Sequence, residues 1–95
     1  MTPEGYEKND LRKALDAAGA YYYMAIPTGY GRTTVDFLCC LRGLFCALET
    51  KTENGRLTAR QRRTLQQVEA AGGVALYGTA AHIIGELKAR GLLPR

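Results

Sequence analysis

The sequence predicts an α/β fold in which helices cover both faces of a central sheet. Helical and strand patterns alternate along the chain, and two neighbouring strand segments, 34–41 and 44–50, are nearly continuous apolar runs. Such runs are typical of strands that are buried on both faces. Hydrophobic residues make up 46% of the 95 residues, which suffices for one compact core. We therefore expect one domain over residues 1–95.

The first predicted elements are a helix over residues 3–18 and a strand over residues 21–26. Thr2 before a proline at the first helical position is typical of a helix start, and Gly19 follows the last apolar residue of the helical pattern. The second segment is rich in aromatic and β-branched residues, and Pro27 ends it.

A hairpin is predicted next, because Arg42-Gly43 separates the apolar strands 34–41 and 44–50. The remaining elements are a helix over 58–71, a short strand over 74–77 and a helix over 79–90. Glycines close the first of these helices, and the last has apolar residues at helical spacing.

Two carboxylates face each other in this hairpin. A two-residue turn at Arg42-Gly43 places Asp36 opposite Glu49, and directly opposed residues lie on one face with Cβ atoms about 5 Å apart. Two carboxylates at this distance repel each other unless a cation lies between them, and Mg²⁺ is a suitable cation. Lys51 lies on the same face, two residues beyond Glu49. A metal with an adjacent ammonium suits phosphodiester hydrolysis.

A simple surface ion-pair cluster is the alternative explanation for Asp36, Glu49 and Lys51. A short D…ExK pattern is common, and by itself it favours this alternative. Both strands are otherwise apolar, however, and three charges inside two buried strands favour a functional explanation. The direct pairing also depends on the hairpin having no bulge.

Gln61 has two competing interpretations. The segment Thr58-Ala59-Arg60-Gln61 matches a capping box, which gives Gln61 a structural role. Gln61 also begins the helix stripe that continues through Leu65 and faces the sheet, so its side chain can reach the strand that carries Glu49. Both roles can hold together.

A net charge of +4 favours an anionic partner such as nucleic acid. The candidate phosphate-binding residues are Arg32, Lys51, Arg56, Arg60, Arg62 and Arg63. Tyr30, in a glycine-flanked loop near Asp36, is a candidate substrate contact. The alternative for the arginines is a solvated charged face.

The three cysteines, Cys39, Cys40 and Cys46, lack the spacing of a disulfide framework or a zinc site. We interpret them as reduced, buried strand residues of a cytoplasmic protein. The absence of serine excludes serine-nucleophile chemistry. We expect neither a signal peptide at the polar N-terminus nor a membrane-spanning helix, because no apolar run approaches the required length.

The motifs resemble those of the virus-type replication-repair nuclease (VRR-NUC) family of the PD-(D/E)xK superfamily. The resemblance covers about residues 29–77, and more loosely the whole chain. It rests on four segments in order: Val35-Asp36-Phe37, Ala47 to Thr52, Gly55 to Gln61, and Ala71-Gly72-Gly73. It implies a restriction-endonuclease-like α-β-β-β-α-β core, with a mixed sheet between helices. The family usually has proline before the aspartate, where this chain has Val35.

The resemblance also implies roles for single residues. Asp36, Glu49 and the Thr50 carbonyl would bind Mg²⁺ or Mn²⁺, Lys51 would be the catalytic lysine, and Gln61 the motif glutamine. A glutamate of the first helix would complete the site. Glu7 is the first candidate for it, with Glu4 and Asp10 as alternatives.

Together these inferences predict a structure-selective DNA endonuclease that acts on branched DNA, such as Holliday junctions or flaps, in a bacterial or phage-infected cell. Because the nuclease core takes up nearly all 95 residues, we expect no sequence-reading domain. Cutting two strands of a junction needs two sites, so we expect a homodimer. The alternative is a non-catalytic nucleic-acid-binding or assembly module. Such a module has no need for Asp36 opposite Glu49.

Overall fold

A computed structural model describes residues 1–26 and 34–95 of the chain. The elements follow in the order helix, strand, strand, strand, helix, strand, helix, as the sequence predicts. They are α1 (Pro3–Ala17), β1 (Tyr21–Met24), β2 (Phe37–Leu41), β3 (Leu44–Thr50), α2 (Ala59–Ala70), β4 (Val74–Gly78) and α3 (Ala80–Ala89).

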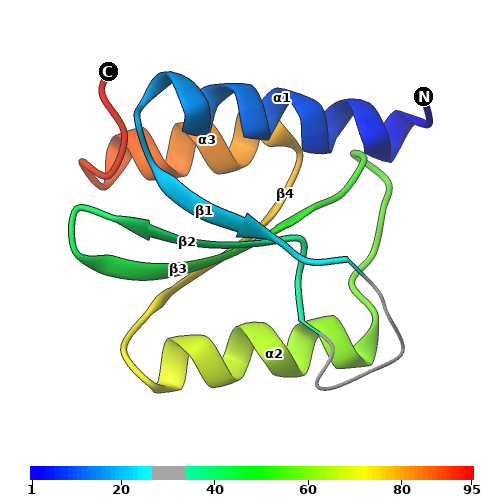
Figure 1. The fold of residues 1–95 in the computed structure, drawn as a ribbon. Coiled ribbons are helices and arrows are strands. Elements are labelled where there is room, and N and C mark those ends of the chain that lie inside the picture. The colour runs from blue at the N-terminus through cyan, green and yellow to red at the C-terminus, as the bar shows by residue number, and fades with distance from the viewer. Residues whose placement is uncertain (27–33) are drawn as a thin grey trace.

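The sheet is mixed and lies between two helical layers. Its strand order is β1-β2-β3-β4; β2 is antiparallel to both β1 and β3, and β4 is parallel to β3. Figure 1 shows α1 and α3 together on one face and α2 on the other. The expected α/β class, with helices on both faces, is confirmed.

The hairpin between β2 and β3 has the predicted two-residue turn. Arg42 and Gly43 both have positive φ, 51° and 83°, as a type I′ turn requires. Leu41 therefore pairs with Leu44, and the same register continues without a bulge to Phe37 and Leu48. This register fixes how the two acidic residues approach each other.

Each face of the sheet has its own apolar core. The larger core joins Leu11 and Leu15 of α1 with Ile83 and Leu87 of α3 over Phe37 and its neighbours. The smaller core joins Val35, Ala47 and Leu65 beneath α2. Val35, which precedes Asp36, is thus a buried core residue.

Two predicted strands are shorter in the structure. β1 ends at Met24 rather than at residue 26, and β2 begins at Phe37 rather than at residue 34. Asp36 lies in a bend just before β2. Its carbonyl accepts a hydrogen bond from the Ala25 N–H at 3.0 Å. Asp36 is therefore adjacent to the β2–β3 ladder rather than a paired member of it.

The prediction that all three cysteines are buried is wrong for Cys40. Cys39 and Cys46 are buried, but Cys40 is exposed. Successive strand residues point to opposite faces, and Cys40 pairs with Tyr21 and Phe45, which are also exposed. Among the described residues, no helix has the length and apolar character needed to cross a membrane.

Candidate active site

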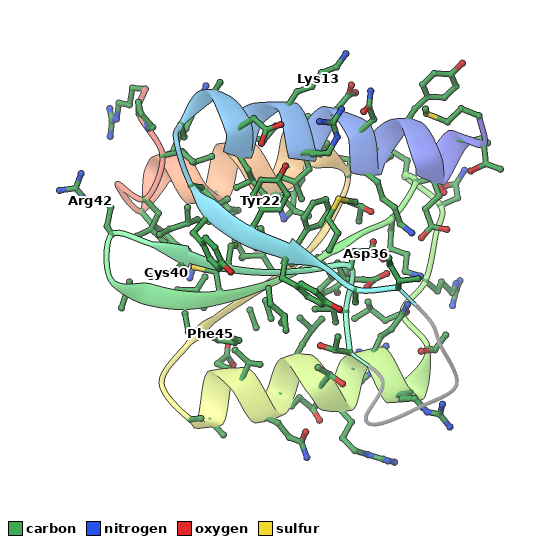
Figure 2. All side chains as sticks on the ribbon, viewed as in Figure 1. Lys13, Tyr22, Asp36, Cys40, Arg42 and Phe45 are labelled. Carbon is green, nitrogen blue, oxygen red and sulfur yellow. The ribbon has the colours of Figure 1, made fainter. Side chains whose placement is uncertain are left out.

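Three carboxylates from distant parts of the chain meet at one end of the sheet. Glu4 comes from α1, Asp36 from the bend before β2, and Glu49 from β3. One carboxylate oxygen of each lies within 4.8 Å of the others. Figure 2 shows Asp36 at the end of the sheet away from the turn residue Arg42. The β2–β3 hairpin and α1 together create this acidic cluster.

Hydrogen bonds link Asp36 and Glu49 in both directions. The Asp36 N–H donates to Glu49 Oε1 at 3.0 Å. In the other direction, Asp36 Oδ2 accepts two hydrogen bonds from Thr50, from its N–H at 3.1 Å and from its hydroxyl at 2.6 Å. The two acids therefore lie close together because the Glu49 carboxylate accepts from the backbone of Asp36, and the Asp36 carboxylate accepts from Thr50, the residue after Glu49.

Glu49 is the most deeply buried of the three acids. It is 1% exposed and lies beside a second carboxylate. Its burial and then the negative charge of Asp36 raise the pKa of Glu49 to about 7, although the hydrogen bond from the Asp36 N–H and the charge of Lys51 oppose this shift. A cation between the acids would favour the ionised form of Glu49.

Two lysines border the acidic cluster. Lys51 Nζ lies 3.7 Å from Glu4 Oε1 and 3.7 Å from Glu49 Oε2, and its side chain is only 13% exposed. Lys8 Nζ lies 3.4 Å from Asp36 Oδ1, and its side chain is more open, at 42%. Within the described part of the chain, three acidic and two basic side chains thus meet here, and Lys51 is the less exposed of the two lysines.

Gln61 has both of the contacts that its sequence context suggested. Its Oε1 accepts a hydrogen bond from the Thr58 N–H at 2.9 Å, which completes the capping box of α2. Its Nε2 donates to Glu49 Oε2 at 3.0 Å. One amide therefore caps the helix and fixes the orientation of the Glu49 carboxylate.

Glu7, the first candidate for the first-helix acid, lies outside the acidic cluster, whereas the alternative Glu4 lies within it. Glu7 Oε1 accepts a hydrogen bond from the Ala80 N–H at 2.7 Å, at the start of α3. A helix N-terminus favours a carboxylate because its first N–H groups lack partners within the helix. Glu4, three residues earlier on the same face, takes the place next to Asp36 and Glu49. Asp10 is exposed and is not part of this group.

Lys8 was missed by the sequence analysis, although the sequence contains a signal for it. Glu4, Lys8, Leu11 and Leu15 follow the spacing of one helix stripe. The two leucines of this stripe are fully buried against the sheet. Extending the stripe towards the N-terminus places Glu4 and Lys8 above the end of the sheet.

The candidate phosphate-binding arginines lie around the start of α2. Arg56 precedes the helix, and Arg60 and Arg63 lie in its first turns; all three are exposed. Arg60 and Gln61 line the same small hollow of about 150 Å³. This places Arg60 beside a residue that contacts Glu49. Tyr30 and Arg32 lie outside the described residues.

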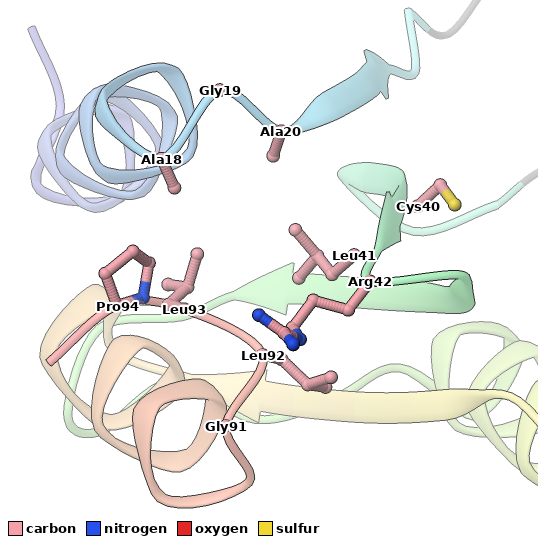
Figure 3. A pocket seen from close by; sticks show the side chains of 10 residues that line it. All are labelled: Ala18, Gly19, Ala20, Cys40, Leu41, Arg42, Gly91, Leu92, Leu93 and Pro94. Carbon is pink, nitrogen blue, oxygen red and sulfur yellow. The ribbon is translucent and has the colours of Figure 1, made fainter.

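A larger hollow of about 430 Å³ lies at the opposite end of the sheet (Figure 3). It lies between the end of α1, the Arg42-Gly43 turn and residues 91–94. β2, with five residues, separates this end from Asp36 by roughly 17 Å. Among the described residues that line the hollow, none is acidic and Arg42 alone is charged. Its described lining therefore offers no carboxylate for a metal ion.

The donor set of the acidic cluster suits a hard divalent cation. All three candidate ligands are carboxylate oxygens, which Mg²⁺ and Mn²⁺ prefer over the nitrogen and sulfur ligands of zinc sites. The ligand atoms also lie close enough together to share one ion. The buried thiols of Cys39 and Cys46 donate to backbone carbonyls of the hairpin, to Cys46 O at 3.7 Å and to Leu44 O at 3.6 Å.

Comparison with known proteins supports the fold. No family model matches the sequence, and no curated protein matches it significantly. One solved structure, described as a VRR_NUC domain, is similar with a TM-score of 0.76 and 21% sequence identity. The match covers 94% of this chain and 97% of that chain. The chain therefore has the VRR_NUC fold, and the restriction-endonuclease-like core expected from the motifs is confirmed.

Proposed function

We propose that this chain is a metal-dependent DNA endonuclease whose active site is the cluster of Glu4, Asp36, Glu49 and Lys51. The observation that carries the proposal is the convergence of three carboxylates, with ligand atoms within 4.8 Å of one another, beside a nearly buried lysine. A binding module has no need to bury Glu49 next to a second acid. The likeness to a solved VRR_NUC domain supports the same conclusion.

Glu4, Asp36 and Glu49 would hold Mg²⁺ or Mn²⁺, together with the Thr50 carbonyl. When bound, the ion would polarise the scissile phosphate and lower the pKa of a water molecule. Lys51 would orient that water, accept its proton or stabilise negative charge on the phosphate. Gln61 would hold the Glu49 carboxylate in place through its 3.0 Å hydrogen bond.

DNA would approach along the start of α2. Arg56, Arg60 and Arg63 are exposed there, and Arg60 lies beside Gln61. Arginines bind phosphates through paired N–H donors without reading sequence, which suits a nuclease that recognises the shape of its substrate. Tyr30 and Arg32 remain candidates for the same role. Replacing Arg60 and Arg63 by alanine should weaken DNA binding and reduce its salt dependence.

The substrate we propose is branched DNA, such as a Holliday junction or a flap, cut by a homodimer. A second copy would supply the second active site that a paired cut needs. Exposed apolar residues support association: Tyr21, Tyr23 and Phe45 are 80%, 59% and 49% exposed and lie on one face of the sheet with Cys40. A monomeric mass by light scattering at micromolar concentration would contradict the dimer.

The test is a cleavage assay on branched, nicked and linear DNA in Mg²⁺ or Mn²⁺, with the parent chain, Asp36→Ala and Lys51→Ala. We expect cleavage by the parent and a loss of at least about 100-fold in each variant, because each removes a group of the reaction. Cleavage that survives in both variants, or that needs no metal, would contradict the proposed mechanism.

The alternative function, a non-catalytic nucleic-acid-binding or assembly module, makes a different prediction in the same experiment. DNA would bind without being cut, and Asp36→Ala would bind it more tightly because it removes a negative charge near the phosphates.

A further inference from the structure

Thr50 lies between the two functional residues Glu49 and Lys51, and its side chain has a contact that the sequence motifs do not explain. It is fully buried and is the last residue of β3. Its hydroxyl donates to Asp36 Oδ2 at 2.6 Å, the shorter of two hydrogen bonds that Thr50 makes to that oxygen. A carboxylate with two donors on one oxygen is fixed in orientation.

Asp36 needs such support because its own backbone is not part of the sheet ladder. The paired residues of β2 begin at Phe37, one position later. Thr50, in contrast, is part of the sheet ladder. It pairs with Gly78 of the parallel strand β4, and the next residue, Lys51, donates its N–H to Gly78 O at 2.7 Å. Thr50, a paired residue of the sheet, can therefore orient the carboxylate of Asp36, which lies just outside the ladder.

The two oxygens of Asp36 consequently have different surroundings. Oδ2 is occupied by Thr50, whereas Oδ1 has Lys8 Nζ as its charged neighbour at 3.4 Å. We infer that the Thr50 hydroxyl is a positioning group that turns Asp36 Oδ1 towards the divalent cation. This inference rests on the proposed function, since it assumes that Asp36 is a metal ligand.

Hydrogen bonds to metal-binding carboxylates and imidazoles raise metal affinity, and their loss typically costs about 10- to 100-fold. Thr50→Val keeps the shape of the side chain and the backbone N–H but removes the hydroxyl. Thr50→Ser restores the hydroxyl without the methyl group. If Thr50 acts through packing alone, loss of the methyl group in Thr50→Ser should weaken metal binding. If it positions Asp36, loss of the hydroxyl in Thr50→Val should weaken metal binding instead.

The experiment is a titration of the purified chain with Mn²⁺, followed by calorimetry, with melting temperatures recorded for each variant. We expect Thr50→Val to bind Mn²⁺ about 10- to 100-fold more weakly than the parent, and Thr50→Ser to bind within about threefold of it. Thr50→Ala takes the place of Thr50→Val if the latter does not fold, with the same expected loss. Thr64→Val is the matched control, because the Thr64 hydroxyl donates only to Arg60 O.

Equal Mn²⁺ affinity in Thr50→Val and the parent would overturn this inference and leave the proposed nuclease intact. Equal weakening in Thr50→Val and Thr50→Ser would also overturn it, because the hydroxyl would then be irrelevant. A parent chain that binds no Mn²⁺ would instead overturn the proposed metal site itself, and this inference with it.

Discussion

The Asp36 N–H donates a hydrogen bond to Glu49 Oε1 at 3.0 Å. This bond joins the two acids of the candidate site through one backbone and one side chain, rather than through the sheet ladder. It partly offsets the cost of keeping Glu49 buried beside a second carboxylate. The metal-free site is thus held together by hydrogen bonds and lysines, and the predictions below test each part of that arrangement.

Glu4 and Glu7 should have separable roles although they lie three residues apart on α1. Glu4→Gln should weaken Mn²⁺ binding at least several-fold with little loss of stability, because Glu4 is part of the acidic cluster. Glu7→Gln should leave Mn²⁺ affinity nearly unchanged but destabilise the fold by about 1 kcal/mol, because Glu7 binds the N-terminus of α3. Calorimetry and urea denaturation measure the two effects. The reverse pattern would restore Glu7 as the metal ligand.

Glu49 should make the metal-free protein less stable as the pH rises. Its pKa is raised from 4.5 to about 7 in the folded state. The folded state therefore binds the proton more tightly than the unfolded state, and stability is lost as the pH rises from about 4.5 towards 7.

Glu49→Gln should remove this loss, so the stability of the variant relative to the parent should increase between pH 5 and pH 8. Urea denaturation in the presence of a chelator measures the difference at each pH. A difference that stays constant over this range would show that Glu49 does not titrate as described.

Gln61→Glu separates the two contacts of Gln61. A glutamate preserves the capping box with Thr58 but replaces the donor to Glu49 Oε2 with a second negative charge. The metal-free variant should therefore be less stable than the parent at pH 8, and the deficit should shrink at pH 5. A deficit that is the same at both values would mean that only the cap matters. Circular dichroism melting at the two pH values distinguishes these outcomes.

Lys8 should compete with the metal for Asp36. Its ammonium lies 3.4 Å from Asp36 Oδ1, so Lys8→Met should increase Mn²⁺ affinity several-fold by removing a like charge from the ion's neighbourhood. Lys13→Met is the charge-matched control, because Lys13 is exposed on the outer side of α1 (Figure 2). Weaker Mn²⁺ binding in Lys8→Met, or equal gains in both variants, would contradict this competition.

Local sequence signals predicted the elements whose geometry is set by neighbouring residues. Arg42-Gly43 adopts the two-residue turn that its composition suggested, and this turn alone fixes the hairpin register. Thr58 and Gln61 form the capping box that their spacing suggested. Asp36 and Glu49 could therefore be placed next to each other from the sequence.

Features that depend on how distant elements pack could not be predicted in the same way. The choice between Glu4 and Glu7 depends on where α3 begins, because Ala80 binds Glu7 across 73 positions of sequence. Helix spacing places both glutamates on one face and does not separate them. The exposure of Cys40 likewise depends on how distant elements pack against the sheet, whereas strand periodicity predicts only the face on which its side chain lies.

The most direct test of the central claim is a crystal structure of the chain grown or soaked in Mn²⁺, with the ion located by its anomalous scattering. The account predicts an ion between Glu4, Asp36 and Glu49, bound by carboxylate oxygens at about 2.1–2.2 Å. It also predicts that Lys8 moves away from Asp36 Oδ1. An ion bound elsewhere, or an acidic cluster that still pairs with both lysines in millimolar Mn²⁺, would contradict it.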